Sequence, residues 1–161
     1  MNKITVTAVA AKAVTAAALL CAALVFIFFL RPRRLELYNT ETGRIYRSFS
    51  APDGTEFSVS FIHSVNLSPV TDVFVVRNGK IYAERTVYAA FGAGVESTLA
   101  PGETLSYDEN GNMVVSGFGT VFPEVKYIVG TVYDHVLVIR GETISLTALC
   151  GRNAHVAFRL A

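Results

Sequence analysis

The fold is decided by residues 56–88, which read EFSVSFIHSVNLSPVTDVFVVRNGKIYAERTVY. Branched and aromatic residues alternate with polar ones in three runs of this stretch, which is the period of strands buried on one face. Asn78-Gly79 suits a two-residue type I′ hairpin between the second and third runs. A four-residue loop, 66–69, is predicted between the first and second runs. These residues therefore predict three consecutive antiparallel strands.

The same pattern continues on both sides of these strands. Turn signals such as Pro52-Asp53-Gly54, Asn110-Gly111 and Arg140-Gly141 separate short alternating runs. No amphipathic helix is expected among them. The strands are predicted at 35–38, 45–49, 56–65, 70–77, 80–88, 104–107, 113–118, 126–129, 135–140, 143–149 and 154–160. The predicted fold is all-β, an antiparallel β-sandwich or a partly open barrel, preceded by one N-terminal transmembrane helix.

The two turns set the register of the central strands. The hairpin at Asn78-Gly79 puts Asp72 opposite Arg85, and the 66–69 loop puts His63 opposite Asp72. Paired residues on neighbouring antiparallel strands point to the same face of the sheet. We therefore expect His63, Asp72 and Arg85 to form one polar row across an otherwise apolar core face.

Two interpretations of this row stay open. An ionised Asp72 on a core face needs cationic neighbours, so the row fits a structural cluster that fixes strand register. The row also fits the floor of a binding site, because its members lie near strand ends that lead into the loops 63–69 and 91–94. The candidate binding or structural residues are His63, Asp72, Arg85, Ser64, Ser68, Gly92 and Gly94.

The predicted register disfavours nucleophilic catalysis. His63 and Ser64 are adjacent on a strand and point to opposite faces, so Ser64 lacks a nearby base. Ser68 is a better placed hydroxyl, but no oxyanion hole is marked. His135 and His155 lie far from His63 in the sequence and lack metal-ligand spacing. We expect no catalytic residue, no metal and no cofactor, with a hydrolase that uses His63 and Ser68 as a minor alternative.

The net charge and the positions of the two cysteines indicate which partners and which cysteine chemistry to expect. The 161 residues carry a net charge of +1, which does not suggest nucleic-acid binding. Cys21 lies in the N-terminal apolar segment and Cys150 near the other end of the sequence, so no internal disulfide is expected. Cys150 follows apolar residues at even spacing and is predicted to be a small core residue of a strand.

Residues 13–30 contain no charged residue and predict a transmembrane helix about 27 Å long. We favour an uncleaved signal-anchor. A cleaved signal peptide is the second reading, but no A-x-A site follows the apolar run. A lipoprotein signal ending at Cys21 is the third, but Leu20 rather than a small residue precedes that cysteine.

The anchor divides the chain into four parts. Residues 1–12 are an N-terminal flank, and 13–30 are the anchor. Residues 31–43 are a juxtamembrane linker with a candidate first strand, and 44–161 are the all-β domain. Basic residues are slightly denser after the anchor, which leans weakly towards a cytoplasmic domain.

Several motifs in this order resemble those of an uncharacterised bacterial and archaeal family, the domain-of-unknown-function family "eighteen-fifty". They are Phe61-Ile62-His63-Ser64-Val65, Pro69-Val70 with a following acidic residue, Asn78-Gly79, and Phe91-Gly92-Ala93-Gly94. The resemblance extends over residues 45–160. The family usually has glutamate at the position of Asp72, so the acid here is one methylene shorter.

This resemblance implies a role beside a transporter. Family members usually carry an N-terminal hydrophobic segment, and their genes often lie beside TRAP transporters of the TAXI type. Those transporters import small organic anions with an extracytoplasmic binding protein. The resemblance therefore implies an accessory protein whose β domain lies outside the cytoplasm, against the weak charge bias. It implies no enzymatic activity and no particular ligand.

The leading expectation is a non-enzymatic, single-pass accessory or interaction protein of the cell membrane. Its partners would be the TRAP permease or the solute-binding protein of the transporter. The alternative is a domain that binds a small organic anion, with positive potential from Arg85, His63 and the amides of the glycine loop.

Overall fold

The computed structural model describes residues 17, 19–22, 33–89 and 99–161. The chain divides into two compact units, Met1–Pro32 and Arg33–Ala161. In the first unit, residue 17 and residues 19–22 are helical. Among the described residues, no helix has both the length and the apolar character needed to span a bilayer. The predicted flank 1–12 and most of the predicted anchor 13–30 lie outside the described residues.

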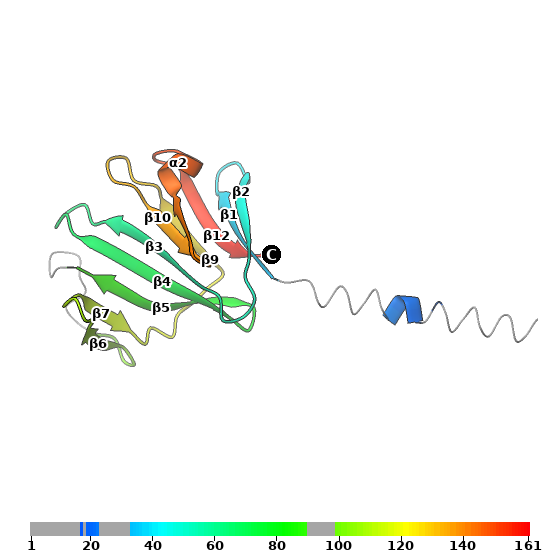
Figure 1. The fold of residues 1–161 in the computed structure, drawn as a ribbon, viewed down its shortest axis with the longest axis horizontal. Coiled ribbons are helices and arrows are strands. Elements are labelled where there is room, and N and C mark those ends of the chain that lie inside the picture. Colours follow the sequence, from blue (N-terminus) through cyan, green and yellow to red (C-terminus); the bar gives the residue numbers. More distant parts are fainter. Residues whose placement is uncertain (1–16, 18, 23–32, 90–98) are drawn as a thin grey trace, which may run out of the picture. The chain divides into compact units, whose positions relative to one another are not determined.

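The second unit consists of two antiparallel sheets (Figure 1). The smaller sheet has the order β2-β1-β12-β9, with β1 (Arg34–Asn39), β2 (Ile45–Ser50), β9 (Glu124–Ile128) and β12 (His155–Leu160). The larger sheet has the order β11-β10-β3-β4-β5-β7-β6, and β8 also pairs with β5. Its strands are β3 (Glu56–Ile62), β4 (Pro69–Arg77), β5 (Lys80–Tyr88), β6 (Thr104–Tyr107), β7 (Met113–Ser116), β8 (Val121–Phe122), β10 (Val136–Ile139) and β11 (Glu142–Ser145).

One apolar core joins the inner faces of the two sheets. Leu37 of β1 and Phe158 of β12 belong to the same buried cluster as Phe57 and Val59 of β3. The alternation that predicted the strands therefore buries one face of each sheet against the other. The prediction of an all-β fold is confirmed, in its sandwich form, and the described strands do not close into a barrel.

The hairpin between β4 and β5 forms as predicted. Arg77 pairs with Lys80, and Phe74 pairs with Ala83. Asn78 and Gly79 have φ angles of 49° and 68°, as a type I′ turn requires. The turn chemistry in the sequence therefore predicts the register correctly for the part of the hairpin next to the turn.

A β-bulge in β5 changes the register farther along this hairpin. Phe74 pairs with Ala83, but Val73 pairs with Arg85, so Glu84 is an extra residue in the ladder. Asp72 consequently pairs with Thr86, and Arg85 points to the other face of the sheet. The predicted Asp72–Arg85 pair is wrong because the alternation of residue types does not reveal the bulge.

The loop between β3 and β4 is longer than predicted. β3 ends at Ile62, and Val59 rather than His63 pairs with Asp72. The amide of Leu67 donates to the His63 carbonyl, and the His63 amide donates to a loop carbonyl, both at 2.9 Å. Residues 63–68 thus form a compact loop instead of the end of a strand. The four-residue shift keeps the predicted face of β3 but removes His63 from the sheet.

The predicted strand 143–149 is in fact β11 followed by a helical turn, α2 (Leu146–Cys150). The Ser145 hydroxyl accepts a hydrogen bond from the Ala148 amide at 3.0 Å, and the Asp134 carboxylate accepts one from an amide in the first turn at 2.9 Å. These acceptors satisfy amides that a helix start leaves unpaired. Cys150 is half-buried at the end of α2 rather than in a strand. β8 was not predicted.

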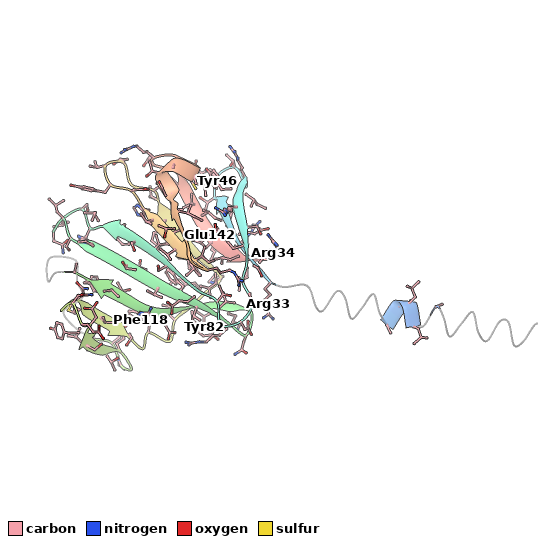
Figure 2. All side chains as sticks on the ribbon, viewed as in Figure 1. Arg33, Arg34, Tyr46, Tyr82, Phe118 and Glu142 are labelled. Atoms are coloured by element: carbon pink, nitrogen blue, oxygen red, sulfur yellow. The ribbon has the colours of Figure 1, made fainter. Side chains whose placement is uncertain are left out.

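The two ends of this unit lie side by side. The Arg34 amide donates to the Ala161 carbonyl at 3.1 Å, and the Ala161 amide donates back at 2.9 Å. Arg33 pairs with Asp53 at 2.9 Å, and Asp53 also accepts from both amides of the Asn78-Gly79 turn. Figure 2 labels Arg33 and Arg34 at the end of the domain where Figure 1, in the same view, marks the C-terminus. Because β4 runs away from the β3–β4 loop towards this turn, that loop lies at the opposite end of the sandwich.

Candidate functional site

The structure separates the three residues of the predicted polar row. His63 lies in the β3–β4 loop, Asp72 lies on the inner face of β4, and Arg85 lies on the outer face of β5. Each has partners different from those predicted. The predicted row is therefore not formed, and the three residues are best considered one at a time.

Asp72 connects the two sheets. One carboxylate oxygen accepts a hydrogen bond from the Thr86 hydroxyl at 2.9 Å, and the other accepts from the Tyr127 hydroxyl of β9 at 2.8 Å. Burial, together with the nearby Asp72 carboxylate, raises the pKa of Tyr127 well above the usual range of tyrosine. The partners that a carboxyl group requires on a core face are thus hydroxyl donors rather than cations.

Arg85 is engaged at the solvent-facing side of the larger sheet. Its guanidinium forms a bidentate pair with Glu56, with nitrogen–oxygen distances of 2.9 and 3.1 Å. Both side chains are partly exposed. Arg85 therefore lies on the opposite face from Asp72, and the described residues do not assemble an anion site from Arg85 and His63.

Two predicted serines share the β3–β4 loop with His63. Ser64 is exposed, whereas Ser68 is buried and its hydroxyl donates to the Asn66 side chain at 2.9 Å. The His63 Nδ1 atom accepts from the Val65 amide at 3.4 Å. These contacts give no nucleophile–base pair between His63 and either serine in the described loop. Gly92 and Gly94 lie outside the described residues.

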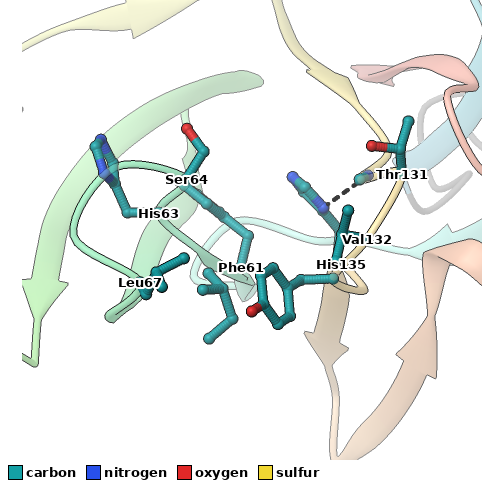
Figure 3. A pocket seen from close by; sticks show the side chains of 10 residues that line it. Phe61, His63, Ser64, Leu67, Thr131, Val132 and His135 are labelled. Atoms are coloured by element: carbon teal, nitrogen blue, oxygen red, sulfur yellow. Dashed lines mark hydrogen bonds between the residues drawn. The ribbon is translucent and has the colours of Figure 1, made fainter.

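A pocket of about 480 Å³ opens beside this loop (Figure 3). One wall comes from the end of β3 and the β3–β4 loop, and the other comes from the loop between β9 and β10. The lining residues are Phe61, Ile62, His63, Ser64, Leu67, Gly130, Thr131, Val132, Tyr133 and His135. The pocket thus includes two of the predicted residues, His63 and Ser64, and adds the β9–β10 loop, which was not predicted.

His135 is held in the pocket wall by a hydrogen bond and by ring contacts. Its Nδ1 atom accepts a hydrogen bond from the Gly130 amide at 3.1 Å, which assigns the neutral tautomer with a proton on Nε2. The ring stacks on Phe61, with centroids 5.2 Å apart and planes at 10°. Burial lowers the pKa of His135 more than Asp134 and Asp72 raise it. In Figure 3 the second ring nitrogen points away from Gly130 towards the Ser64 side of the pocket.

Gly130 allows the β9–β10 loop to fold tightly beneath His135. A Cβ atom on this residue would lie 2.1 Å from the Tyr133 carbonyl oxygen and 3.3 Å from the His135 Nδ1 atom. The first distance is far below any normal contact, so a side chain here would displace the loop. The observed conformation of this pocket wall therefore requires glycine at position 130.

Large exposed apolar side chains lie on the two loops that form the pocket, and three of them, Leu67, Val132 and Tyr133, line it. Val65 and Leu67 on the β3–β4 loop are 67% and 62% exposed, and Val132 and Tyr133 on the β9–β10 loop are 72% and 45% exposed. We call these four residues the apolar rim. Single exposed apolar residues are common on proteins, but a group of them beside a pocket is typical of a binding surface.

The remaining histidines are considered next as potential metal ligands. In the ranges that the structure describes, no three His, Cys, Asp or Glu side chains are placed to hold a metal ion. His155 lies on β12, with its Nδ1 atom 3.8 Å from Glu41, and does not line the pocket. His135 immediately precedes β10, which begins at Val136, one residue after the start of the predicted strand 135–140.

Sequence reasoning missed His135 because its neighbours are distant in the sequence. The pairing of Val136 with Ser60 brings His135 beside Phe61. A signal was present, since Gly130 and Asp134-His135 mark a tight turn before a strand. Only the pairing of β10 with β3 shows that this turn faces the His63 loop.

These features define a small antiparallel β-sandwich domain with a pocket at one end. Over residues 57–146, more than half of its length, the chain matches the family described as "Domain of unknown function (DUF1850)", and it belongs to this family. The resemblance predicted from the motifs is thus confirmed, and the matched range includes the whole pocket lining. No curated protein and no solved structure matches the chain.

Proposed function

We propose that this protein is a non-enzymatic, membrane-anchored accessory or interaction protein of a TAXI-type TRAP transporter. The observation that carries the proposal is the apolar rim, four large exposed side chains on two adjacent loops at one end of the sandwich. In this proposal the rim is the surface that contacts the transporter permease or its solute-binding protein.

The rim suits a protein partner for physical reasons. Burying apolar surface contributes about 25 cal/mol per Å², so exposed Leu, Val and Tyr side chains lose a favourable contribution until a partner covers them. The rim belongs to loops that are held at defined positions, one by the His63 carbonyl bond and the other by the Gly130–His135 bond. A preformed surface of this kind binds with a small ordering cost.

The contacts around the pocket favour binding over chemistry. The Ser68 hydroxyl donates to Asn66, and the His135 Nδ1 atom accepts from Gly130. Among the described contacts, no hydrogen bond joins His63 or His135 to the hydroxyl of Ser64 or Ser68. A hydrolase would need a nucleophile and base within hydrogen-bond reach, and these described contacts do not supply one.

The membrane part of the proposal rests on the sequence of residues 13–30 and on the resemblance to the family. An uncharged apolar stretch of this length suits an uncleaved signal-anchor. The small residues at 16–18 and 22–23 permit close packing against permease helices. The β domain would be extracytoplasmic, where it can reach both the permease and the solute-binding protein.

Affinity purification of the tagged full chain after mild solubilisation tests this proposal. We expect the wild type to recover permease or solute-binding subunits of a TRAP transporter. Recovery should fall sharply for the double variant Leu67→Asn, Val132→Thr. Asn suits the left-handed φ of 53° at Leu67, so this variant changes the rim while the backbone is retained.

The matched control is the double variant Leu105→Asn, Val121→Thr. Both residues are exposed apolar residues, each 41% exposed, and lie on β6 and β8 outside the pocket lining. This control should recover the transporter like the wild type. Failure of the wild type to recover any transporter subunit would reject the proposed partner, and equal recovery by both double variants would reject the rim.

A further inference from the structure

The pocket beside the apolar rim has the size and lining of a small-molecule site. Its volume of about 480 Å³ lies within the range of 300–1,000 Å³ that is usual for ligand pockets. Most of the lining is apolar or aromatic, and a few polar groups from two loops converge on it. The pocket therefore offers apolar contact area and a limited number of oriented hydrogen bonds.

The lining determines which polar group a ligand should carry. The proton on the His135 Nε2 atom is a donor, because the Nδ1 atom already accepts from Gly130. Stacking on Phe61 fixes the direction of this donor. A ligand oxygen that accepts this proton would satisfy the one ring atom of His135 that the described contacts leave open.

The charges near the pocket favour an uncharged acceptor over an anion. No Lys, Arg, Asp or Glu is among the described lining residues. The carboxylates of Asp134 and Asp72 both act on His135 from outside the lining, and Arg85 is paired with Glu56 on the outer face of β5. An anionic ligand would lose hydration without gaining a fixed cation.

We propose that this pocket binds a compact, uncharged small molecule with an aromatic or branched apolar body and one carbonyl oxygen that accepts the His135 Nε2 proton. The body would lie against Phe61 and the rim residues Leu67 and Val132. This ligand class goes beyond the proposed transporter partnership and stands without it.

Acetophenone is a suitable probe, because it combines a phenyl ring with one neutral carbonyl. Ethylbenzene has a similar shape without the acceptor, and benzoate replaces the acceptor with an anion. The isotope-labelled full chain in lipid nanodiscs would be titrated with each probe by NMR, with free probe concentrations measured by dialysis. Acetophenone should shift the amide signals of Ile62 and Thr131 and the imidazole nitrogen signals of His135.

We expect acetophenone to bind about five- to tenfold more tightly than ethylbenzene, the effect of one hydrogen bond. Benzoate should also bind more weakly than acetophenone. His135→Gln should weaken acetophenone binding, and His155→Gln, at an exposed histidine outside the pocket, should not. The comparison of probes on the wild type remains decisive if His135→Gln does not fold.

Several results would overturn the inference. Signal shifts outside the pocket would reject the site, and equal affinity for the three probes would reject the His135 hydrogen bond. Tightest binding of benzoate would replace the uncharged ligand with an anion. Intact acetophenone binding by a protein that recovers no transporter would reject the proposed function and leave this inference standing.

Discussion

At the scale of single residues, Asp72 shows how a carboxyl group is accommodated on a core face without a cation. Its partners are hydroxyl groups on two different sheets, Thr86 on β5 and Tyr127 on β9. The sequence indicated that Asp72 needs partners but suggested the cationic ones. The nearest cation on the paired strand, Arg85, instead pairs with Glu56 on the other face.

Tyr127→Phe should destabilise the protein by about 2 kcal/mol at pH 7, since it removes a hydrogen bond to the partly buried Asp72 carboxylate. The pKa of Tyr127 is raised in the folded state, so this contribution is fully present below about pH 10 and decreases at higher pH. The stability difference between wild type and Tyr127→Phe should therefore narrow above pH 10. Urea unfolding of both proteins between pH 7 and 11 measures it.

Tyr107→Phe is the control for this prediction, because Tyr107 is 65% exposed. It should change the unfolding free energy little at any pH in the series. A constant difference between wild type and Tyr127→Phe across the whole range would contradict the raised pKa of Tyr127.

Arg85→Ala should cost less than about 1 kcal/mol, because the Arg85–Glu56 pair is partly exposed and screened by solvent. If Arg85 formed the predicted ion pair with Asp72 inside the core, its removal would instead cost about 3–5 kcal/mol. Thermal and urea unfolding distinguish the two cases. Arg77→Ala, which removes the comparable exposed pair with Glu84, should give a similarly small change.

At the scale of elements, strand interiors were predictable and strand ends were not. Alternation in residues 56–61 and the turn at Asn78-Gly79 are local signals, so they predict the β3–β4–β5 order and the register beside the turn. Val65 continues the apolar alternation past Ile62 and extends the predicted strand, although β3 ends there and Val65 is exposed on the rim. The alternation of apolar and polar residues does not distinguish an apolar residue exposed on the surface from one buried in the core.

The pocket could be predicted only in part, because it is formed by the pairing of strands that are distant in the sequence. His63 and Ser64 were identified as site residues from the sequence, and they do line the pocket. The opposite wall follows from the pairing of β10 with β3, and neither turn chemistry nor alternation specifies that pairing. The bulge at Glu84 is a similar case, since a single inserted residue leaves no distinctive local pattern.

Gly130→Ala should displace the β9–β10 loop, because the added Cβ would meet the Tyr133 carbonyl at 2.1 Å. We expect a loss of about 2 kcal/mol or more in unfolding free energy, together with loss of acetophenone binding. Gly141→Ala is the comparison, since Gly141 has open space around it but a φ of +79°. That variant should cost about 1 kcal/mol and leave the pocket intact. Equal effects of the two variants on acetophenone binding would contradict the assigned role of Gly130.

At the scale of the whole molecule, the proposed extracytoplasmic location can be tested directly by cysteine labelling. Burial raises the pKa of the Cys150 thiol to about 11, so little of it is the reactive thiolate at neutral pH. Replacing Cys21 and Cys150 with alanine gives a background without thiols. Single cysteines can then be added at the exposed residue Glu109 and at Asn2 in the N-terminal flank.

A membrane-impermeant maleimide should label Glu109→Cys in intact cells and Asn2→Cys only after permeabilisation. This pattern follows from a single-pass anchor with the β domain outside the cytoplasm. The reverse pattern would place the β domain in the cytoplasm, in agreement with the weak excess of basic residues that follows the anchor.

The paired backbone bonds between Arg34 and Ala161 have a practical consequence for engineering. Because the first and last strands of the β domain end as neighbours, a short peptide could join Ala161 to Arg33, and the circle could be reopened at the Gly111 turn. The same closeness would let the domain be spliced into a surface loop of a carrier protein. The inserted domain would be attached to the carrier at the end where its termini lie, and its pocket would be exposed at the opposite end.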